Sequence, residues 1–400
     1  MWTTAKIHLE IFWIFFRLGW TSFGGPVAHL EYFRRVFVEQ RRWLLPQQYT
    51  DLVALCQFLP GPASSQVGMA IGLLQGGYRG ACAAWFGFTF PSVLLMFLLA
   101  LWIQSGVQGI PSGLWQGLLI AAVAVVAHAI IAMAKSLTPD WPRRSLALCT
   151  AIIILFVPVP WIQYLLLLLG AIFGGYWYRH CAVRPAEQDW LQAYPHLPSY
   201  RQSMAWGCVF LLLLLGLPIL SWFYHQPLLA VMDSFYRAGA LVFGGGHVVL
   251  PLLQAEAVPA GWLTDNEFMA GYGAAQIVPG PLFSFAAFVG AFATPENGPL
   301  TGAIVATMMI FLPAMLLILA VLPLWFRLLR YPLVQAASFG IHVVVLGMLL
   351  AAFYQPVLKH GILDWMDAVL AILAWSLLQF GKLSLGWVIF GTCVVSWVLS

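Results

Sequence analysis

Charged residues are scarce in this sequence. Asp, Glu, Lys and Arg together make up 8% of the 400 residues, while hydrophobic residues make up 62%. An ordinary soluble domain carries roughly 25% charged residues, and no polar stretch here is long enough for a soluble domain of about 50 residues. Apolar runs of about 15 to 27 residues recur from end to end. The composition therefore predicts a single all-α polytopic membrane protein, with the lipid bilayer as its surroundings.

Several chemical motifs are also missing. The six cysteines are scattered without any CxxC pair, which argues against a metal site and a disulfide framework. No block of basic residues suits a nucleic-acid backbone, so no nucleic-acid partner is expected. HExxH, GxSxG and paired aspartates within the apolar runs are absent, and we predict neither an enzyme nor a cofactor. The apolar stretch between Glu10 and Arg17 is too short for a cleavable signal.

What the sequence has instead is a set of glycine and proline motifs that occurs twice, about 220 residues apart. The first set is Arg17-x-Gly19 with Phe23-Gly24-Gly25-Pro26, Trp43-Leu44, Gln57-x-x-Pro60-Gly61-Pro62, and Gly80-Ala81 followed by Pro91. The second set is Arg237-x-Gly239 with Phe243-Gly244-Gly245-Gly246, Trp262-Leu263, Gln276-x-x-Pro279-Gly280-Pro281, and Gly302-Ala303 followed by Pro313. Chance does not keep this order, so we infer an internal duplication.

The duplication divides the chain into two repeats, 1–178 and 226–400, joined by a polar linker and a connecting transmembrane helix within 179–225. Each repeat is expected to begin with two broken helices, at about 7–40 and 48–76 in the first half and about 227–256 and 265–293 in the second. Unbroken helices are expected at about 79–104, 113–134, 144–158, 160–178, 203–224, 299–326, 332–354, 364–380 and 384–399.

The placement of basic residues favours re-entrant hairpins over spanning segments. Short cytoplasmic loops collect Lys and Arg. If all four broken segments turn back inside the membrane, 15 of the 18 basic residues fall on one side, and Lys359, Arg17 and Arg237 are the exceptions. Glu256, Asp265, Glu267 and Glu296 then fall on the opposite face. The hairpin model also makes the halves antiparallel, and an inverted-topology repeat of this kind is typical of secondary transporters.

The broken helices predict an anion site. Irregular backbone survives at membrane depth only where protein or a wet cavity covers it. Pro62 suits the first position of a new helix, so the N–H groups of Ser64, Ser65 and Gln66 would point into the gap at the positive end of the helix dipole. The predicted binding residues at the four breaks are Gly24, Gly25, Pro26, Gln57, Pro60, Gly61, Pro62, Ser64, Ser65, Gly244, Gly245, Gly246, Gln276, Pro279, Gly280, Pro281 and Ser284.

Two arginines and two histidines complete the candidate site. Arg17 lies eleven residues past Lys6, which places it about 16 Å along a helix, and Arg237 is its counterpart. An intramembrane Arg is a functional candidate, and its planar fork suits an oxyanion; the alternative is a salt bridge that only holds the hairpin together. His29 and His247 follow the glycine breaks and could carry protons, and the alternative for each is a histidine held by hydrogen bonds.

The motif set as a whole resembles the chromate ion transporter family in its long two-domain form. The resemblance rests on Phe23-Gly24-Gly25-Pro26 with Arg17-x-Gly19, on both Pro-Gly-Pro motifs, and on Gly80-Ala81 with Pro91, and it covers nearly the whole chain. It implies a multi-pass protein of the bacterial inner membrane that exports chromate and confers resistance, with sulfate as the natural look-alike. Gly246-His247 replaces the Pro26-Val27 of the first half, so the two hairpins need not bind equally.

Two points stay open at this stage. A passive anion channel is the alternative to a carrier, because paired half-helices that meet at mid-membrane also build selective pores. A homodimer is one open form of assembly.

Overall fold

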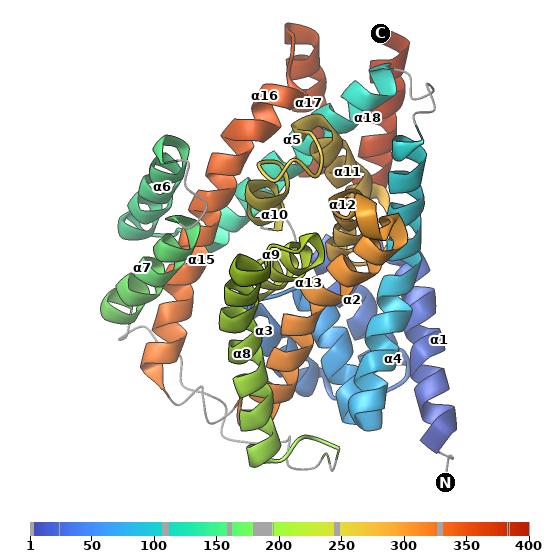
Figure 1. The fold of residues 1–400 in the computed structure, drawn as a ribbon, viewed down its shortest axis with the longest axis vertical. Coiled ribbons are helices and arrows are strands. Elements are labelled where there is room, and N and C mark those ends of the chain that lie inside the picture. Colours follow the sequence, from blue (N-terminus) through green and yellow to red (C-terminus); the bar gives the residue numbers. More distant parts are fainter. Residues whose placement is uncertain are drawn as a thin grey trace.

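A computed structural model describes most of the chain, and all its regular structure in the described residues is helical (Figure 1). The described residues are 4–23, 25–105, 112–157, 162–178, 194, 196–243, 249–325, 331–381, 383 and 385–399. Gly24, Gly244, Gly245, Gly246 and His247 lie outside them, as does most of the predicted linker.

In the first half the helices stop and restart at the glycine and proline motifs, as predicted. The broken segments give α1 (Thr4–Thr21), α2 (Gly25–Arg34) with a π-helical continuation (Arg35–Gln40), α3 (Pro46–Phe58) and α4 (Ala63–Gln104). The remaining helices are α5 (Ser112–Leu137), α6 (Trp141–Phe156), α7 (Ile162–Trp177) and the connecting α8 (Tyr200–Tyr224). α4 bends at Gly76 and Gly77, whose backbone leaves helical geometry. The expected boundary between residues 76 and 79 is therefore a bend.

The second half repeats this order. Its broken segments give α9 (Pro227–Leu241), α10 (Val249–Ala257), α11 (Asp265–Ile277), a 3-10 turn (Leu282–Ser284) and α12 (Phe285–Ala293). The remaining helices are α13 (Pro299–Val321), α15 (Pro332–Ala352), a π-helical turn (Phe353–Leu358), α16 (Lys359–Gly361), α17 (Trp365–Gln379) and α18 (Leu385–Leu399). α12 and α13 correspond to the two arms of α4 on either side of its bend.

The halves exchange their later helices. α5 of the first half packs against α17 and α18 of the second, while α15 of the second half packs against α6 and α7 of the first, which lie together along one side of it in Figure 1. Within each half the first helix packs on the arm that lies beyond the bend: α1 packs on the part of α4 after Gly77, and α9 packs on α13. Each half therefore completes its packing with helices of the other.

Each half has a corner, which is the bend of α4 at Gly76 and Gly77 in the first half and the junction of α12 and α13 in the second. A pair of glycines lets the two arms of each corner touch. A Cβ on Gly72 would lie 2.3 Å from the carbonyl oxygen of Gly80, and one on Gly80 would lie 2.1 Å from that of Gly72. Gly290 and Gly302 make the same reciprocal approach in the second half, at 2.5 and 2.0 Å. No side chain fits at these distances, so each corner depends on backbone-to-backbone contact.

The outer surface is apolar, as expected for a multi-pass membrane protein. Four described helical stretches are long and apolar enough to cross a bilayer: 63–104, 113–135, 200–224 and 299–324. Along α8 the side chains of Leu211, Leu212 and Leu215 are 54%, 69% and 65% exposed. Leucines this exposed on consecutive turns are stable only against lipid or another protein.

Candidate functional site: where the broken helices meet

Each Pro-Gly-Pro break is hydrogen-bonded to the glycine-rich break of the other half. The N–H of Gly61 donates to the carbonyl oxygen of Val242 at 2.6 Å, and the N–H of Gly280 donates to that of Ser22 at 3.0 Å. Ser22 and Val242 occupy matching places, two residues before Gly24 and Gly244. The two bonds are therefore reciprocal, and they bring the four breaks together in two crossed pairs.

Glycine is required at both Pro-Gly-Pro motifs. Gly61 has φ +121° and Gly280 has φ +100°, conformations that strain any residue with a Cβ. Space is also short: a Cβ on Gly61 would lie 2.9 Å from Gln66 Nε2, and one on Gly280 would lie 3.0 Å from Ser92 Oγ. The glycines thus let the chain turn where the other half's backbone approaches.

The start of α4 differs by one residue from the prediction. Pro62 is the N-cap of α4, and Ala63 is its first helical residue. The N–H of Gln66 is therefore the first that can reach back four residues, and it bonds to Pro62 O at 2.9 Å. The prediction that this N–H is free was wrong. The N–H groups left without an intrahelical partner are those of Ala63, Ser64 and Ser65.

The matching start in the second half is tighter. After Pro281 the chain makes a single 3-10 turn before α12, and the N–H of Ser284 bonds to Pro281 O at 3.0 Å. Pro279, Gly280, Pro281 and Ser284 are all buried. The first half therefore leaves three N–H groups unpaired at its helix start, whereas the 3-10 turn of the second half pairs the N–H of Ser284.

His29 ties three of the breaks together. Its ring is 1% exposed, with Nε2 3.2 Å from Ser22 O and Nδ1 3.4 Å from Ser64 Oγ. A carbonyl oxygen can only accept, so Nε2 carries the hydrogen, and in the neutral ring Nδ1 accepts from Ser64. Ser22 O also accepts from Gly280. His29 therefore links the glycine-rich break of the first half to the Pro-Gly-Pro breaks of both halves. This is the hydrogen-bonded alternative foreseen for His29.

Polar atoms without a partner collect beside these breaks. In the described part of the chain, buried side-chain atoms that make no hydrogen bond include Ser22 Oγ, Ser65 Oγ, Gln66 Oε1 and Thr89 Oγ1, while Gln276 Nε2 is buried beside the Tyr272 hydroxyl. A buried polar atom left unpaired costs about 1–3 kcal/mol, so several in one region call for water or a ligand. The side chains of Ser22, Gln66 and Thr89 were missing from the predicted set. Gln66 also holds the turn, because its Nε2 donates to Pro60 O at 2.7 Å.

The two glutamines that precede the Pro-Gly-Pro motifs are not equivalent. Gln276 is 7% exposed, whereas the side chain of Gln57 lies on the surface. The backbone of Gln57 still contributes, because its carbonyl oxygen accepts from His342 Nε2 at 3.2 Å. Of the predicted pair, only Gln276 lies with the buried polar atoms.

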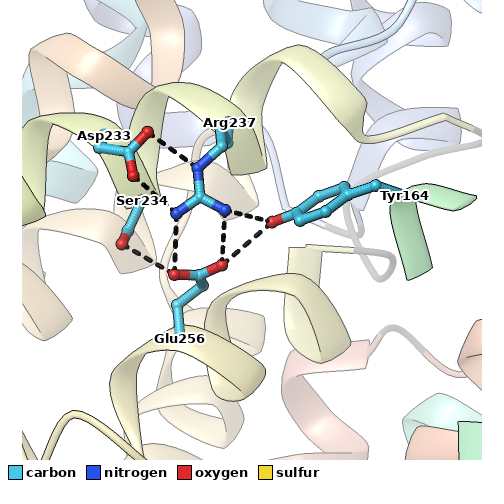
Figure 2. A network of polar contacts seen from close by, with 5 residues as sticks. All are labelled: Tyr164, Asp233, Ser234, Arg237 and Glu256. Atoms are coloured by element: carbon cyan, nitrogen blue, oxygen red, sulfur yellow. Dashed lines mark hydrogen bonds and ion pairs between the residues drawn. The ribbon is translucent and has the colours of Figure 1, made fainter. Parts of the chain in front are cut away.

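Arg17 and Arg237 lie in opposite surroundings. Arg17 is exposed on α1, on the face that also carries Trp13 (52% exposed) and Trp20 (41% exposed), and the described residues offer it no ion pair. Arg237 lies in a network with Asp233 and Glu256 (Figure 2). Its side chain is 19% exposed, and those of the two acids are 9% and 14% exposed.

The guanidinium of Arg237 is fully occupied by protein. Nε donates to Asp233 at 2.8 Å, and Nη2 donates to Asp233 at 2.7 Å and to Glu256 at 3.0 Å. Nη1 donates to Glu256 and to the Tyr164 hydroxyl, both at 2.9 Å (Figure 2). An arginine has five N–H donors, and these bonds use all five. Arg237 can bind an anion only if part of this network opens.

The acids of this network were not predicted. Glu256 was expected in a loop on the face opposite the basic residues, whereas it lies on α10 and pairs with Arg237. The four-residue spacing of Asp233 and Arg237 on one helix was a signal for that pair. No sequence signal pointed to Tyr164, which comes from the other half. Among the described residues no group of His, Cys, Asp and Glu is arranged to hold a metal ion.

Both halves of the chain resemble one family of known proteins. The model of the chromate transporter family matches the chain twice, over residues 9–176 and 229–397. A chromate transport protein of Pseudomonas aeruginosa is 28% identical, covering 76% of this chain and 70% of that protein. One of Cupriavidus metallidurans is 26% identical (96% and 91%), and an uncharacterized transporter of Methanocaldococcus jannaschii is 26% identical (94% and 90%). No solved structure matches significantly.

Proposed function

Because this chain belongs to the chromate transporter family, we propose that it is a secondary transporter that exports chromate across a bacterial inner membrane. Two of the relatives above are named as chromate transport proteins. Sulfate, which has the same tetrahedral shape and charge, is the expected competitor. The exported anion would be bound where the four breaks meet.

The pair of crossed hydrogen bonds is the observation that carries this proposal. The bonds from Gly61 to Val242 and from Gly280 to Ser22 tie the Pro-Gly-Pro break of each half to the glycine-rich break of the other, and α5 and α15 exchange partners in the same reciprocal way. Reciprocal contacts of this kind are what a two-fold inverted repeat would make, and transporters with inverted repeats bind their cargo at the repeat interface. The broken segments would be re-entrant hairpins that reach this interface.

Neutral donors would bind the dianion. The unpaired N–H groups of Ala63, Ser64 and Ser65 lie at the positive end of the first arm of α4, the Ser65 hydroxyl is buried without a hydrogen bond, and Gln276 Nε2 is buried beside the Tyr272 hydroxyl. Such groups can replace the water that the anion loses without adding a charge that would trap it. Gln66 would support the site by holding the Pro60 turn rather than by touching the anion.

The two arginines would have different roles in transport. Arg17, with no acid beside it in the described chain, would supply the positive field that favours a dianion over a neutral solute. Arg237 would hold the second broken segment in place. This division replaces the expectation that both guanidinium groups bind the anion alike.

The membrane potential supports the export direction. Each elementary charge is worth about 2.3 kcal/mol per 100 mV, so an inside-negative potential favours outward movement of a dianion by roughly 4.6 kcal/mol. Export therefore needs no coupled ion to be downhill at equal concentrations.

Uptake of radiolabelled chromate and sulfate into inverted membrane vesicles tests the proposal. We expect saturable chromate uptake that unlabelled sulfate inhibits, and a loss of about tenfold or more when Ser65→Ala and Gln276→Ala are combined. Uptake equal to that of vesicles without the protein would refute it. Acceleration by chromate on the opposite side marks a carrier, whereas single-channel currents would establish the channel alternative.

A further inference from the structure

The Arg237 network divides into one pair within α9 and a set of contacts between helices. Asp233 and Arg237 are four residues apart on α9, and among the described residues Asp233 accepts only from Arg237. Glu256 comes from α10 and accepts from Arg237 at 2.9 and 3.0 Å, from the Tyr164 hydroxyl at 3.0 Å and from the Ser234 hydroxyl at 3.0 Å (Figure 2). Every contact between helices in this network therefore involves Glu256 or Tyr164 of α7.

The network carries one more negative than positive charge. One guanidinium faces two carboxylates, and in the described part of the chain no second cation touches either acid. α12 and α13, which pack on α9, have no ionisable side chain. The other neighbouring helices carry nine further ionisable groups. These are Tyr200, Arg201, Cys208 and Tyr224 on α8, Tyr176 on α7, Asp265, Glu267 and Tyr272 on α11, and His342 on α15.

None of these groups replaces Arg237 as a partner of Glu256. The four on α8 are exposed, Asp265 accepts from Gln254 at 2.7 Å, and His342 donates to the Gln57 carbonyl. Glu256 is therefore the acid that opening of the network would leave alone, because Asp233 remains with Arg237 on the same helix. A carboxylate that loses its cation in a partly buried place is stabilised by taking up a proton.

We propose that Glu256 is the proton-carrying residue of the transport cycle, ionised while α7, α9 and α10 are latched together and protonated when they separate. The inference rests on the transport function proposed above. In the step itself a proton from water binds the carboxylate, and no other bond than this O–H forms. The neutral Asp233–Arg237 pair stays behind, so α9 never exposes an unpaired guanidinium.

We call the contacts of Glu256 with Arg237, Tyr164 and Ser234 the latch. The latch can act on the anion site through the backbone. α9 and α10 flank the second glycine-rich break, and Val242, just after α9, accepts the hydrogen bond from Gly61. A shift of α10 away from α9 would change the break between them and hence the Pro-Gly-Pro turn of the first half. Protonation of Glu256 and release of the anion would be linked in this way.

Chromate exchange in proteoliposomes tests the latch. Equal chromate is placed on both sides, the voltage is clamped at zero, and internal and external pH are varied together. The wild type should slow as the pH rises, by up to about tenfold per unit, as one required proton predicts. Glu256→Gln imitates the protonated acid and should exchange at a rate independent of pH. Glu267→Gln, on a carboxylate that only caps α11, should keep the wild-type profile.

Asp233→Asn should have the opposite effect to Glu256→Gln, although both remove one acid from Arg237. It makes Glu256 the sole counter-ion of Arg237. Separation of α10 from α9 would then leave the guanidinium without a carboxylate, so chromate exchange should be slower by about tenfold or more at every pH. Equal losses in the two variants, or a wild-type pH profile in Glu256→Gln, would overturn the proposal.

A milder variant keeps the test decisive if Glu256→Gln does not fold. Tyr164→Phe removes one hydrogen bond that favours ionised Glu256, so proton uptake becomes easier and the profile should move to higher pH. An unchanged profile would contradict the latch. Wild-type exchange without any pH dependence would also overturn it while leaving transport intact, whereas a wild type that exchanges neither chromate nor sulfate would refute the proposed function itself.

Discussion

The two halves keep an arginine at the same place in their first helix but meet its charge differently. In α9 the residue four positions before Arg237 is Asp233, whereas in α1 the residue four positions before Arg17 is Trp13. The acids near the first break are used elsewhere: Glu31 and Glu39 both pair with Arg34, at 2.7 and 2.9 Å, and Glu10 pairs with Arg41. The motif thus has an arginine in both copies, but among the described residues only the arginine of the second copy is paired with acids.

This difference separates a structural charge from an available one. Arg237 is neutralised and saturated, so its removal mainly exposes the acids around it. Arg17 makes no ion pair with the described residues, so its removal leaves no acid uncompensated. Under the proposed function, its removal would weaken the positive field at the anion site. Matching positions in the two repeats therefore need not share a role, and matched variants can test this.

The largest effect is expected for Arg237→Gln. Removing one member of a buried ion pair leaves uncompensated charge and costs about 3–5 kcal/mol. The thermal unfolding midpoint of the detergent-solubilised protein should fall clearly, while Arg17→Gln should change the unfolding free energy by no more than about 0.5 kcal/mol. Equal melting of the two variants would remove the distinction between the halves.

The second effect should be the same in both halves. Gly61→Ala and Gly280→Ala place a Cβ at φ +121° and +100°, against Gln66 and Ser92 respectively. We expect each to lower the unfolding free energy by about 1–3 kcal/mol, measured by the same melting assay. Gly216→Ala on α8 is the matched control, since no atom lies within 4 Å of its added Cβ. A large loss in only one of the first two variants would mean that the crossed breaks are not equivalent.

Arg17→Gln should reduce transport without affecting folding. Loss of the free guanidinium weakens the attraction for a dianion, and we expect the initial rate of chromate uptake into inverted vesicles to fall about tenfold, or about 1.4 kcal/mol. Arg17→Lys keeps the charge and should retain most of the rate. A Gln variant as active as the wild type would leave the proposed site without a cation.

The helix breaks could be predicted from sequence because their causes are local. Proline and glycine act on their own backbone, so α3 ends before Pro60-Gly61-Pro62 and α11 before Pro279-Gly280-Pro281, as expected. Where the prediction erred, at Pro62, the difference is one residue in the helix start. That single residue decided which N–H groups are left unpaired.

The partners of Arg237 could not be predicted so easily, because they depend on how helices pack. Glu256 is nineteen residues from Arg237 and Tyr164 seventy-three, and no local pattern brings them together. The exchange of α5 and α15 between halves is likewise a property of the tertiary fold. The sequence therefore predicted the breaks and the repeat-related arginines, while the counter-ions that distinguish these arginines required the structure.

The smallest expected effect uses another difference between the halves, at the starts of α3 and α11. α11 has a complete capping box, in which the Thr264 hydroxyl accepts from the Glu267 N–H at 3.2 Å and Glu267 accepts from the Thr264 N–H at 2.7 Å. At α3, Gln48 makes the returning bond to the Leu45 N–H at 2.9 Å, but Leu45 has no side-chain oxygen and is 65% exposed.

Leu45→Thr should therefore complete the box in α3, and Thr264→Ala should break it in α11. We expect a gain of about 0.5–1 kcal/mol for the first and a loss of about 1 kcal/mol for the second, read from the unfolding midpoint. Leu45→Val, which is β-branched like threonine but has no hydroxyl, is the control and should give no gain. A similar gain from valine would assign the effect to the loss of an exposed leucine, and the start of α3 would then not be limited by its missing cap.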